Sequence, residues 1–457
     1  MGRNLLLNMA DQGLAVVGLD LDPLKAKVLA SEVSPQHHLK GVWAVIDFVS
    51  VLKKPRAILL LVPAGKPVDV AIAGLLPSLD EGDIIIDGGN TYFTDTDRRA
   101  LELAKRKIHF FGMGVSGGEN GARYGPSMMP GGDKVAYERL RPVFEAIAAK
   151  VAGEPCVAYM GSGSAGHYVK MVHNGIEYGI MQLIAEVYDL MKRGLGLPDA
   201  TIQEAFEMWN TQELQSYLVE ITADILKKQD TDTGQLLVNV IADRARSKGT
   251  GKWTSQNAMD LQVPVPVIDM AVMMRDLSSH KEQRVAAADQ YPSDMENNQV
   301  DDMEATLAQL KNALYVAVTV TYAQGLAQLQ VASQAYGYGI DLEQVARIWR
   351  GGCIIRSQSL EIFRKAFNRN PQLANLLLDE EIAGLVRDRQ KDLRWLVKLA
   401  VDRSIPVAAF MAALSYFDAF RSAQLPTNLI QAQRDYFGAH QYERTDREGI
   451  FHTQWDE

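Results

Sequence analysis

Polar residues follow one face of a predicted helix near the middle of the chain. They are Lys170, His173, Asn174 and Glu177. Their spacing of i, i+3, i+4 and i+7 places them together on an α-helix, and the otherwise apolar segment should be buried. A buried lysine can lose its proton near neutral pH and a buried glutamate can retain its own, which suits a general base and a general acid. A structural ion pair or a solvated stripe would show the same spacing, so the spacing alone leaves both interpretations open.

Glycine-rich turns elsewhere in the chain are candidate sites for an anionic ligand. Lys248–Thr254 is basic, and such a turn can cradle an anion through backbone N–H groups, although it lacks the spacing of a P-loop. Asp87–Asn90 and Ser116–Gly118 each follow a predicted strand, where glycine lets a ligand reach the backbone. Gln433–His440 combines arginine, histidine and aromatic residues without apolar periodicity. Ordinary turns and loops are the alternative for each segment.

Composition bounds the class of protein. A chain of 457 residues should hold two or three domains. The formal net charge of -9 argues against a nucleic-acid partner held by bulk electrostatics, while local basic sites for a small anion stay open. Cys156 and Cys353 are the two cysteines, so the sequence predicts no disulfide framework and no cysteine-based zinc site, in a reducing, cytoplasmic setting. The sequence also predicts no membrane span and no signal peptide.

The first part of the chain, to about residue 160, has an α/β pattern. Candidate strands are Leu14–Asp20, Ala57–Val62, Asp83–Asp87, Ile108–Val115 and Pro155–Met160, and candidate helices include Thr96–Lys107 and Lys134–Val151. Strands that alternate with helices predict a parallel sheet with right-handed crossovers. Ligands bind at the carboxyl ends of such strands.

The first residues predict a helix with no strand before it. A dinucleotide-binding fold should begin with a strand, a glycine-rich turn and a helix, and only the last glycine of such a turn, Gly2, is present. We therefore expect that the first strand is missing, because of a start site placed too far downstream or a trimmed chain. A central strand that is lost would leave its neighbours with unpaired backbone groups.

Two aspartates follow the next predicted strand. An acidic residue at this point suits the ribose 2′-hydroxyl of NAD. Asp20 is the better candidate, because Asp22 is placed to cap the helix that begins near Pro23. Both carboxylates would repel the 2′-phosphate of NADP, and no arginine stands beside them.

The remainder, from about Gly166 to Gln424, predicts a helical domain with an internal repeat. Tyr178–Ile221 and Tyr322–Ile362 each contain a long helix, a glycine-rich turn and a later tryptophan. The second copy has Thr321 where the first has Glu177, so the acid is unique to the first copy. This difference favours a catalytic role for the polar stripe over a purely structural one. The final segment, from about Leu425, predicts a tail that packs on a partner subunit.

The motifs together resemble those of the decarboxylating 6-phosphogluconate dehydrogenase family, along nearly the full chain. The matching segments are Ile86–Asn90, Gly114–Glu119, Met129–Gly132, Lys170–Tyr178, Lys248–Thr254, Gly351–Arg356 and Gln431–His440. The resemblance implies a Rossmann-like domain over 1–163, an all-helical domain over 164–424 and a tail over 425–457 that reaches the other subunit of a homodimer. It also implies oxidation and decarboxylation of 6-phosphogluconate to ribulose 5-phosphate, with NAD or NADP and without a metal.

The resemblance assigns a role to each candidate site residue. Lys170 would be the general base and Glu177 the general acid, assisted by His173 and Asn174. The residues expected to hold the substrate are Asn90, Ser116, Gly117, Gly118, His173, Asn174, Tyr178, Lys252, Thr254, Arg275 and, from the partner's tail, Arg434 and His440. The residues expected to hold the cofactor are Gly2, Asp20, Leu21, Asp22, Val62, Pro63, Ala64 and Asn90.

The sequence departs from the family at the predicted cofactor site. The family has Asn-Arg-Ser or Asn-Arg-Thr where this chain has Asp20, Leu21 and Asp22, and it has lysine where this chain has Pro63. Both changes remove positive charge, so we expect a preference for NAD. Two alternatives stay open: a related β-hydroxyacid dehydrogenase that acts on another acid, and a dimeric binding protein with an impaired cofactor site. The first alternative should lack the expected phosphate-binding residues, which are present: Lys252, Arg275, Arg434 and His440. The intact Lys170–Glu177 pair argues against the second alternative.

Overall fold

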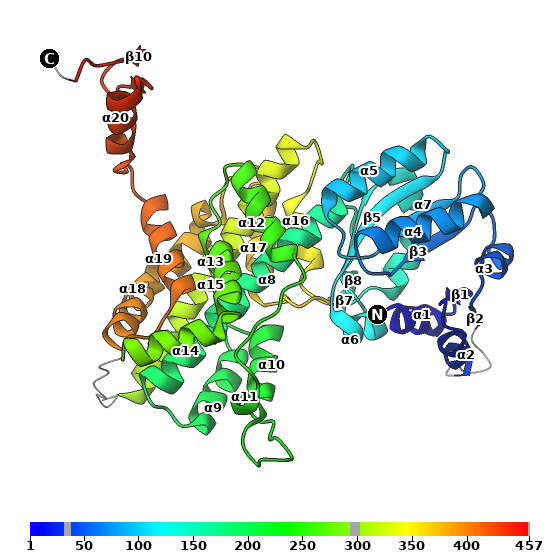
Figure 1. The fold of residues 1–457 in the computed structure, drawn as a ribbon, viewed down its shortest axis with the longest axis horizontal. Helices are drawn as coiled ribbons and strands as arrows, with labels where there is room; N and C mark the ends of the chain where they lie inside the picture. Colours follow the sequence, from blue (N-terminus) through cyan, green and yellow to red (C-terminus); the bar gives the residue numbers. More distant parts are fainter. Residues whose placement is uncertain (32–37, 293–301, 456–457) are drawn as a thin grey trace.

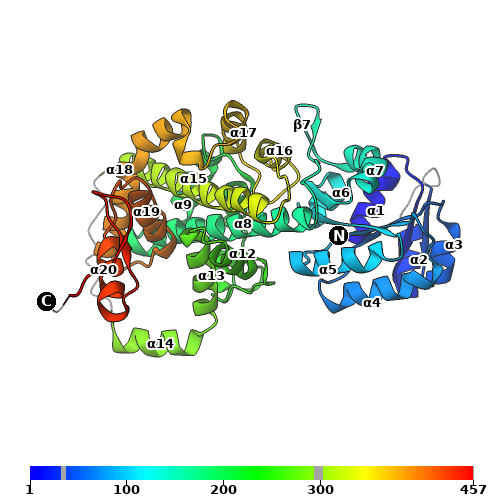
Figure 2. The ribbon, with the colours of Figure 1, turned by 90° about the horizontal axis from the view of Figure 1, so that it is seen from above.

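The computed structural model describes residues 1–31, 38–292 and 302–455. An α/β domain and a larger helical domain lie next to each other along the longest axis of the molecule (Figure 1). Helix α8 (Ala165–Asp189) runs from the junction of the two domains into the helical domain (Figure 2). Within the described ranges, no helix combines the length and apolarity needed to span a membrane.

The α/β domain contains a four-stranded sheet. Its order is β3 (Ala57–Leu60), β4 (Ile84–Asp87), β5 (His109–Val115) and β6 (Met128–Gly132). The first three strands are parallel, and β6 is antiparallel to β5. A second, two-stranded sheet pairs β1 (Val16–Leu19) with β2 (Leu39–Val42) in parallel. The helices of the domain are α1 (Gly2–Asp11), α2 (Pro23–Ser31), α3 (Val45–Val51), α4 (Lys66–Leu75), α5 (Phe93–Ala104), α6 (Gly118–Tyr124) and α7 (Lys134–Ile147).

Side chains alternate between the two faces of the larger sheet, as the two-residue period of a strand requires. Ile84, Ile86 and Phe111 belong to a buried cluster with Leu5 of α1 and Phe144 of α7. The neighbouring residues Ile58, Ile85 and Phe110 belong to a cluster on the other face, with side chains of α3, α4 and α5. Helices therefore cover both faces, which is the doubly wound α/β arrangement that the pattern predicts.

The structure corrects one predicted strand and adds several that were not predicted, among them β2 and β6. Pro155–Met160 is not a strand: Pro155 ends β8 (Glu154–Pro155), which forms a hairpin with β7 (Lys150–Val151), and Val157 makes only an isolated bridge to Met128. The edge position beside β5 is taken instead by β6, whose sequence Met-Met-Pro-Gly-Gly gives little strand signal. The other predicted strands contain β1, β3, β4 and β5, with bounds shifted by a few residues.

The helical domain is built around α8 and α15 (Met303–Ala335). Its other elements are η2 (Leu190–Gly194), α9 (Asp199–Asn210), α10 (Tyr217–Ile225), α11 (Leu237–Val240), α12 (Thr250–Asp260), α13 (Pro266–Ser278), α14 (Lys281–Gln290), α16 (Leu342–Ile348), α17 (Ser359–Arg369), η3 (Leu376–Leu378), α18 (Glu380–Asp402) and α19 (Ala408–Phe420). The order α8, α9, α10 corresponds to α15, α16, α17, in line with the repeat in the sequence. The last segment, α20 (Thr427–Gly438) with β9 (Tyr442–Glu443) and β10 (Ile450–Phe451), extends away from the domain (Figure 1).

Candidate active site

The polar stripe lies where α8 meets the carboxyl end of β5. Small residues make this close approach possible: a Cβ at Gly166 would lie 2.5 Å from the carbonyl oxygen of Gly112 and 2.6 Å from the nitrogen of Gly131. Lys170, His173 and Asn174 are buried, and α8 is helical throughout, so the predicted buried helix is confirmed. Lys170 and His173 contact Ser116 of the α/β domain, whereas the Glu177 side chain is 20% exposed.

The Lys170 amine is held by neutral partners. Its Nζ donates hydrogen bonds to Oδ1 of Asn174 at 2.8 Å and to Oγ of Ser116 at 3.1 Å, and it lies 3.2 Å from Nδ1 of His173. Burial lowers the pKa of Lys170, and the charge of Glu177 opposes this shift. Since loss of water costs a charged amine more than a neutral one, this environment favours the neutral amine.

His173 and Glu177 continue the stripe. Nε2 of His173 lies 3.3 Å from Oγ of Ser116, and Nδ1 lies 3.8 Å from Oε2 of Glu177. Burial, and then the charge of Lys170, lower the pKa of His173 well below its ordinary value. Burial raises the pKa of Glu177, opposed by Lys170 and Arg275. The arrangement therefore favours an unprotonated lysine and a protonated glutamate, the pair that base and acid catalysis require.

The predicted phosphate-binding residues meet on one side of this stripe. The guanidinium of Arg275 lies over the ring of Tyr178, 3.5 Å from its centroid, and a Cβ at Gly251 would contact that ring at 2.5 Å. Lys252 follows Gly251 in α12 and is exposed. Thr254 is placed differently: its buried hydroxyl donates to the carbonyl oxygen of Met171 at 2.9 Å, so it ties α12 to α8.

Two loops of the α/β domain border the stripe. Asn90 is exposed after β4, and its loop is shaped by Asp87, which accepts hydrogen bonds from the Gly89 nitrogen at 3.0 Å and the Thr91 hydroxyl at 2.7 Å. Ser116 is buried after β5. Gly117 caps α6 with a φ of 94°, a left-handed conformation that favours glycine.

The predicted cofactor residues gather at the carboxyl ends of β1 and β3. Leu21 is 80% exposed, and Oδ1 of Asp20 accepts a hydrogen bond from the Asp22 nitrogen at 2.9 Å. Asp22 in turn accepts from the nitrogen of Leu24, which confirms it as a cap for α2. Val62, Pro63 and Ala64 follow β3, and a Cβ at Gly2 would lie 3.9 Å from Leu61. The start of α1 thus lies beside the end of β3, and helix starts attract phosphate groups, so these residues fit a dinucleotide.

Arg434 and His440 are not brought to this site within one chain. Both belong to the tail segment, at the end of the helical domain opposite the α/β domain (Figure 1, Figure 2). Arg434 donates to Gln431 within the tail at 3.0 Å.

The structure adds a residue that sequence reasoning did not place in the site. The ring of Trp349 meets the ring of His173 edge-on, with centroids 5.4 Å apart, and is fully buried. Cys353 is also buried, and burial raises the pKa of its thiol to about 12. The segment Gly351–Arg356 is one of the motifs that resemble the family, and only the fold reveals that it lies near α8.

A doubly wound domain joined to an all-helical domain, with a buried lysine and a partly buried glutamate at the junction, defines a two-domain dehydrogenase. Comparisons identify its family. The NAD binding domain of 6-phosphogluconate dehydrogenase matches residues 1–161, and the 6-phosphogluconate dehydrogenase C-terminal domain matches residues 166–455. The chain belongs to the 6-phosphogluconate dehydrogenase family.

Individual relatives agree over the whole chain. The NADP(+)-dependent, decarboxylating 6-phosphogluconate dehydrogenase of Bacillus subtilis is 50% identical over 455 residues, which cover 100% of this chain and 97% of the relative. The decarboxylating enzyme of Escherichia coli is 50% identical over 456 residues, with coverage of 100% and 97%. A solved structure of similar fold is the 6-phosphogluconate dehydrogenase of Plasmodium falciparum, described in its apo form and in complex with NADP+ or 6-phosphogluconate. It is 42% identical to this chain with a TM-score of 0.96, and the match covers 100% of this chain and 98% of that chain.

Proposed function

We propose that this protein oxidises and decarboxylates 6-phosphogluconate to ribulose 5-phosphate and carbon dioxide. The observation that carries the proposal is the buried Lys170 amine, held by Ser116 and Asn174 at 3.1 and 2.8 Å, with Glu177 on the same face of α8. Relatives that cover the whole chain at 50% identity bear the name of this activity.

Lys170 is the proposed base. Its neutral amine takes the proton of the substrate's 3-hydroxyl, which prepares carbon 3 for oxidation. A bound nicotinamide cofactor supplies the hydride acceptor. The protonated Lys170 then donates a hydrogen bond to the 3-keto oxygen, and the β-keto acid loses carbon dioxide because the polarised carbonyl accepts the electron pair of the breaking bond.

Glu177 is the proposed acid. As carbon dioxide leaves, Lys170 gives its proton to the former keto oxygen, which produces an enediol and a neutral amine. Glu177 then protonates carbon 1 of the enediol, which is carbon 2 of the substrate, while Lys170 takes the hydroxyl proton back, and ribulose 5-phosphate results. A carboxyl group whose pKa is raised by burial holds the proton that this step needs. His173 lies between the two groups and orients both.

The remaining site residues are proposed to hold the substrate. Asn90, Ser116, Gly117, Gly118, His173 and Asn174 would bind the sugar acid. Tyr178, Lys252 and Arg275 would bind the phosphate end, where a guanidinium and an ammonium supply charge-assisted hydrogen bonds. Thr254 is proposed to support Tyr178 and Lys252 by fixing α12 on α8.

Gly2, Asp20, Leu21, Asp22, Val62, Pro63, Ala64 and Asn90 are proposed to hold the cofactor. We propose a preference for NAD over NADP, because two carboxylates flank the exposed Leu21 at the end of β1 and would repel a 2′-phosphate. The Bacillus subtilis relative is named for NADP(+), so this preference would separate the present chain from that relative.

We further propose a homodimer with exchanged tails and a division into domains 1–163 and 164–424 and a tail 425–457. The tail exposes Leu429, Ile430 and Phe437, which are 61%, 56% and 72% accessible in the single chain. Apolar groups in such a position are stabilised by a partner surface. A tail laid on the partner would carry Arg434 and His440 to the partner's site.

The test of the activity is an assay of the purified chain with 6-phosphogluconate and either cofactor. We expect reduced nicotinamide and carbon dioxide in equal amounts. Lys170→Met should abolish both products, whereas Lys311→Met, which removes a partly buried lysine paired with Glu213, should leave the activity close to wild type. No turnover by the wild-type chain with either cofactor would overturn the proposal.

A further inference from the structure

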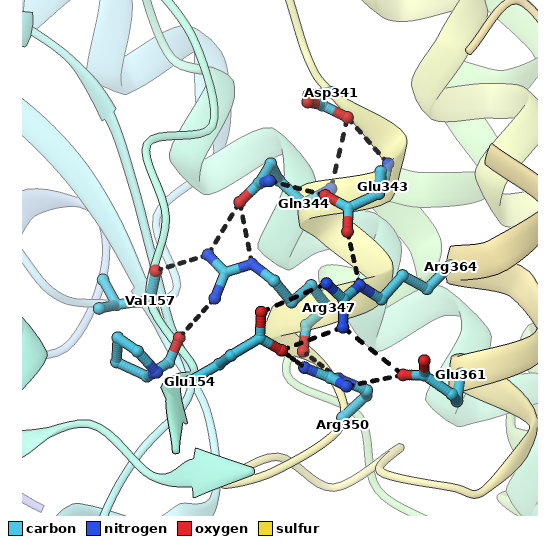
Figure 3. A network of polar contacts seen from close by, with 10 residues as sticks. Glu154, Val157, Asp341, Glu343, Gln344, Arg347, Arg350, Glu361 and Arg364 are labelled. Carbon is cyan, nitrogen blue, oxygen red and sulfur yellow. Dashed lines mark hydrogen bonds and ion pairs between the residues drawn. The ribbon is translucent and has the colours of Figure 1, made fainter. Parts of the chain in front are cut away.

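A cluster of ion pairs joins the two domains next to the candidate active site (Figure 3). Glu154, at the β7–β8 hairpin of the α/β domain, pairs with Arg350 and with Arg364 of the helical domain. Arg350 also pairs with Glu361 of α17, with Nη1 2.6 Å from Oε2. This cluster therefore connects a hairpin of one domain with a helix of the other. We call it the clamp, and its residues are Glu154, Arg350, Glu361 and Arg364.

A second set of contacts reinforces the same junction. Arg347, at the end of α16, donates to the carbonyl oxygens of Pro155 at 2.8 Å and Val157 at 3.2 Å (Figure 3). Arginine can bridge acceptors in this way because its planar fork carries several fixed donors. The hairpin is thus held both through its Glu154 side chain and through its backbone.

The residues that follow Arg350 pack directly on the loop that carries Ser116. The carbonyl oxygen of Gly352 accepts a hydrogen bond from the Ser127 nitrogen at 2.8 Å, and the Ser127 carbonyl accepts from the Ser116 nitrogen at 2.9 Å. Gly352 has a φ of 65°, and a Cβ there would lie 2.6 Å from the Gly125 carbonyl oxygen. A Cβ at Gly117 would lie 2.5 Å from the Gly352 carbonyl oxygen. Because these contacts are so close, the segment around Gly352 and the loop that carries Ser116 cannot shift independently of each other.

The residue before Arg350 touches the polar stripe itself. Trp349 meets the ring of His173 edge-on at 5.4 Å. Arg350 therefore lies between one contact to His173 and another, through Gly352 and Ser127, to Ser116. Ser116 and His173 are both partners of the Lys170 amine.

We propose that Arg350 is a positioning residue: its ion pair with Glu154 seats residues 349–352 between the two domains, so that Ser116 and His173 stay in contact with Lys170. The side chain of Arg350 is 9% exposed and that of Glu154 is 40% exposed, so the guanidinium is shielded from water while its carboxylate partner lies at the surface. The effect on catalysis rests on the proposed function, whereas the effect on the Ser116–Ser127–Gly352 contacts does not.

The variant Arg350→Lys tests the proposal, because lysine keeps the charge but lacks the fork that reaches Glu154 and Glu361 together. Arg56→Lys is the matched control. Arg56 has the same 9% side-chain exposure and also pairs with two carboxylates, Asp80 and Asp83. It precedes β3, at the edge of the sheet away from the active site.

We expect Arg350→Lys to lower kcat by about tenfold, as a small misplacement of catalytic groups does, with a smaller change in the KM for substrate. Glu154→Gln should do the same, and the double variant should lose little more than either single one, because both act through one contact. Arg56→Lys should leave kcat near wild type. Equal effects in Arg350→Lys and Arg56→Lys, or full kcat in Arg350→Lys, would overturn the proposal.

Hydrogen exchange gives a second measurement that needs no activity. The Ser127 amide should exchange faster in Arg350→Lys and in Glu154→Gln than in Arg56→Lys. If the wild-type chain does not turn over 6-phosphogluconate, the proposed function fails and exchange at Ser127 still decides for or against the clamp. Unchanged exchange in both variants contradicts it.

Discussion

The Lys170 amine and Nδ1 of His173 lie 3.2 Å apart, and both side chains are buried. Two positive charges at this distance without solvent would repel strongly, and burial lowers the pKa of both groups. Both pKa shifts favour the neutral forms of the two groups in this contact. Asn174 accepts from the amine at 2.8 Å, which orients the lone pair of Lys170 without a countercharge.

Glu177→Gln should lower kcat by about a hundredfold, because the amide cannot deliver a proton to carbon 1 of the enediol. Since the acid form of Glu177 is the active one and burial raises its pKa, wild-type kcat should fall as the pH rises through that raised pKa. The variant should lose this alkaline limb. A pH profile of kcat in both proteins checks this, and an unchanged alkaline limb in Glu177→Gln would assign it to another group.

The double change Asp20→Asn with Leu21→Arg should move the cofactor preference toward NADP by on the order of tenfold, about 1.4 kcal/mol. The arginine supplies a partner for the 2′-phosphate, and asparagine keeps the Oδ1 that accepts from the Asp22 nitrogen. The ratio of kcat/KM for the two cofactors is the measurement. Asp20→Asn with Leu21→Gln is the control for loss of the carboxylate alone, and an unaltered ratio in the arginine variant refutes the charge argument.

Two inactive variants should restore activity when they are combined, if the tails are exchanged. Lys170→Met destroys the site of its own subunit, and Arg434→Ala destroys the contribution of its tail to the partner. After unfolding and refolding of an equal mixture, half of the dimers are mixed and each has one complete site, so about a quarter of wild-type activity should return. Activity no higher than the average of the two variants would place Arg434 outside the partner's site.

Glu186 should make the protein less stable as the pH rises from the acid side toward neutrality. Its side chain is buried on α8 and accepts from the backbone nitrogens of Ala409 and Phe410 at 2.9 and 3.1 Å, at the start of α19. Burial raises its pKa to about 7. The folded protein therefore holds a proton that the unfolded chain releases above its ordinary pKa of 4.5. The added stability is present below that value and is lost as the pH rises through about 7, for a total of ~3 kcal/mol.

Glu186→Gln should remove this dependence, so that its melting temperature changes less than that of wild type between about pH 5 and about pH 8. Thermal melts of both proteins in the same buffers check it. Glu204→Gln, at an exposed position of α9, is the control. Parallel melting curves for wild type and Glu186→Gln would show that Glu186 is ionised in the folded protein.

The sequence predicted the central feature of the site because the feature is local. Lys170 and Glu177 share a face of one helix, and helical spacing alone brings them together. The strand predicted at Asp83–Asp87 was equally clear, since the apolar run of the observed strand Ile84–Asp87 is buried on both sides. β6 was missed because it contains Pro130 and two glycines and is specified by its pairing with β5. The contact of Trp349 with His173 joins distant segments, so no local pattern could predict it.

The protonation state of Lys170 tests the central claim most directly. Protein labelled with ¹³C at the lysine ε-carbons can be titrated by NMR, with the Lys170 signal assigned from its loss in Lys170→Met. We expect this carbon to titrate clearly below the ordinary lysine pKa of about 10.4, while exposed lysines titrate near that value. A Lys170 signal that stays in the charged form up to the same pH as exposed lysines would contradict the assignment of Lys170 as a neutral base.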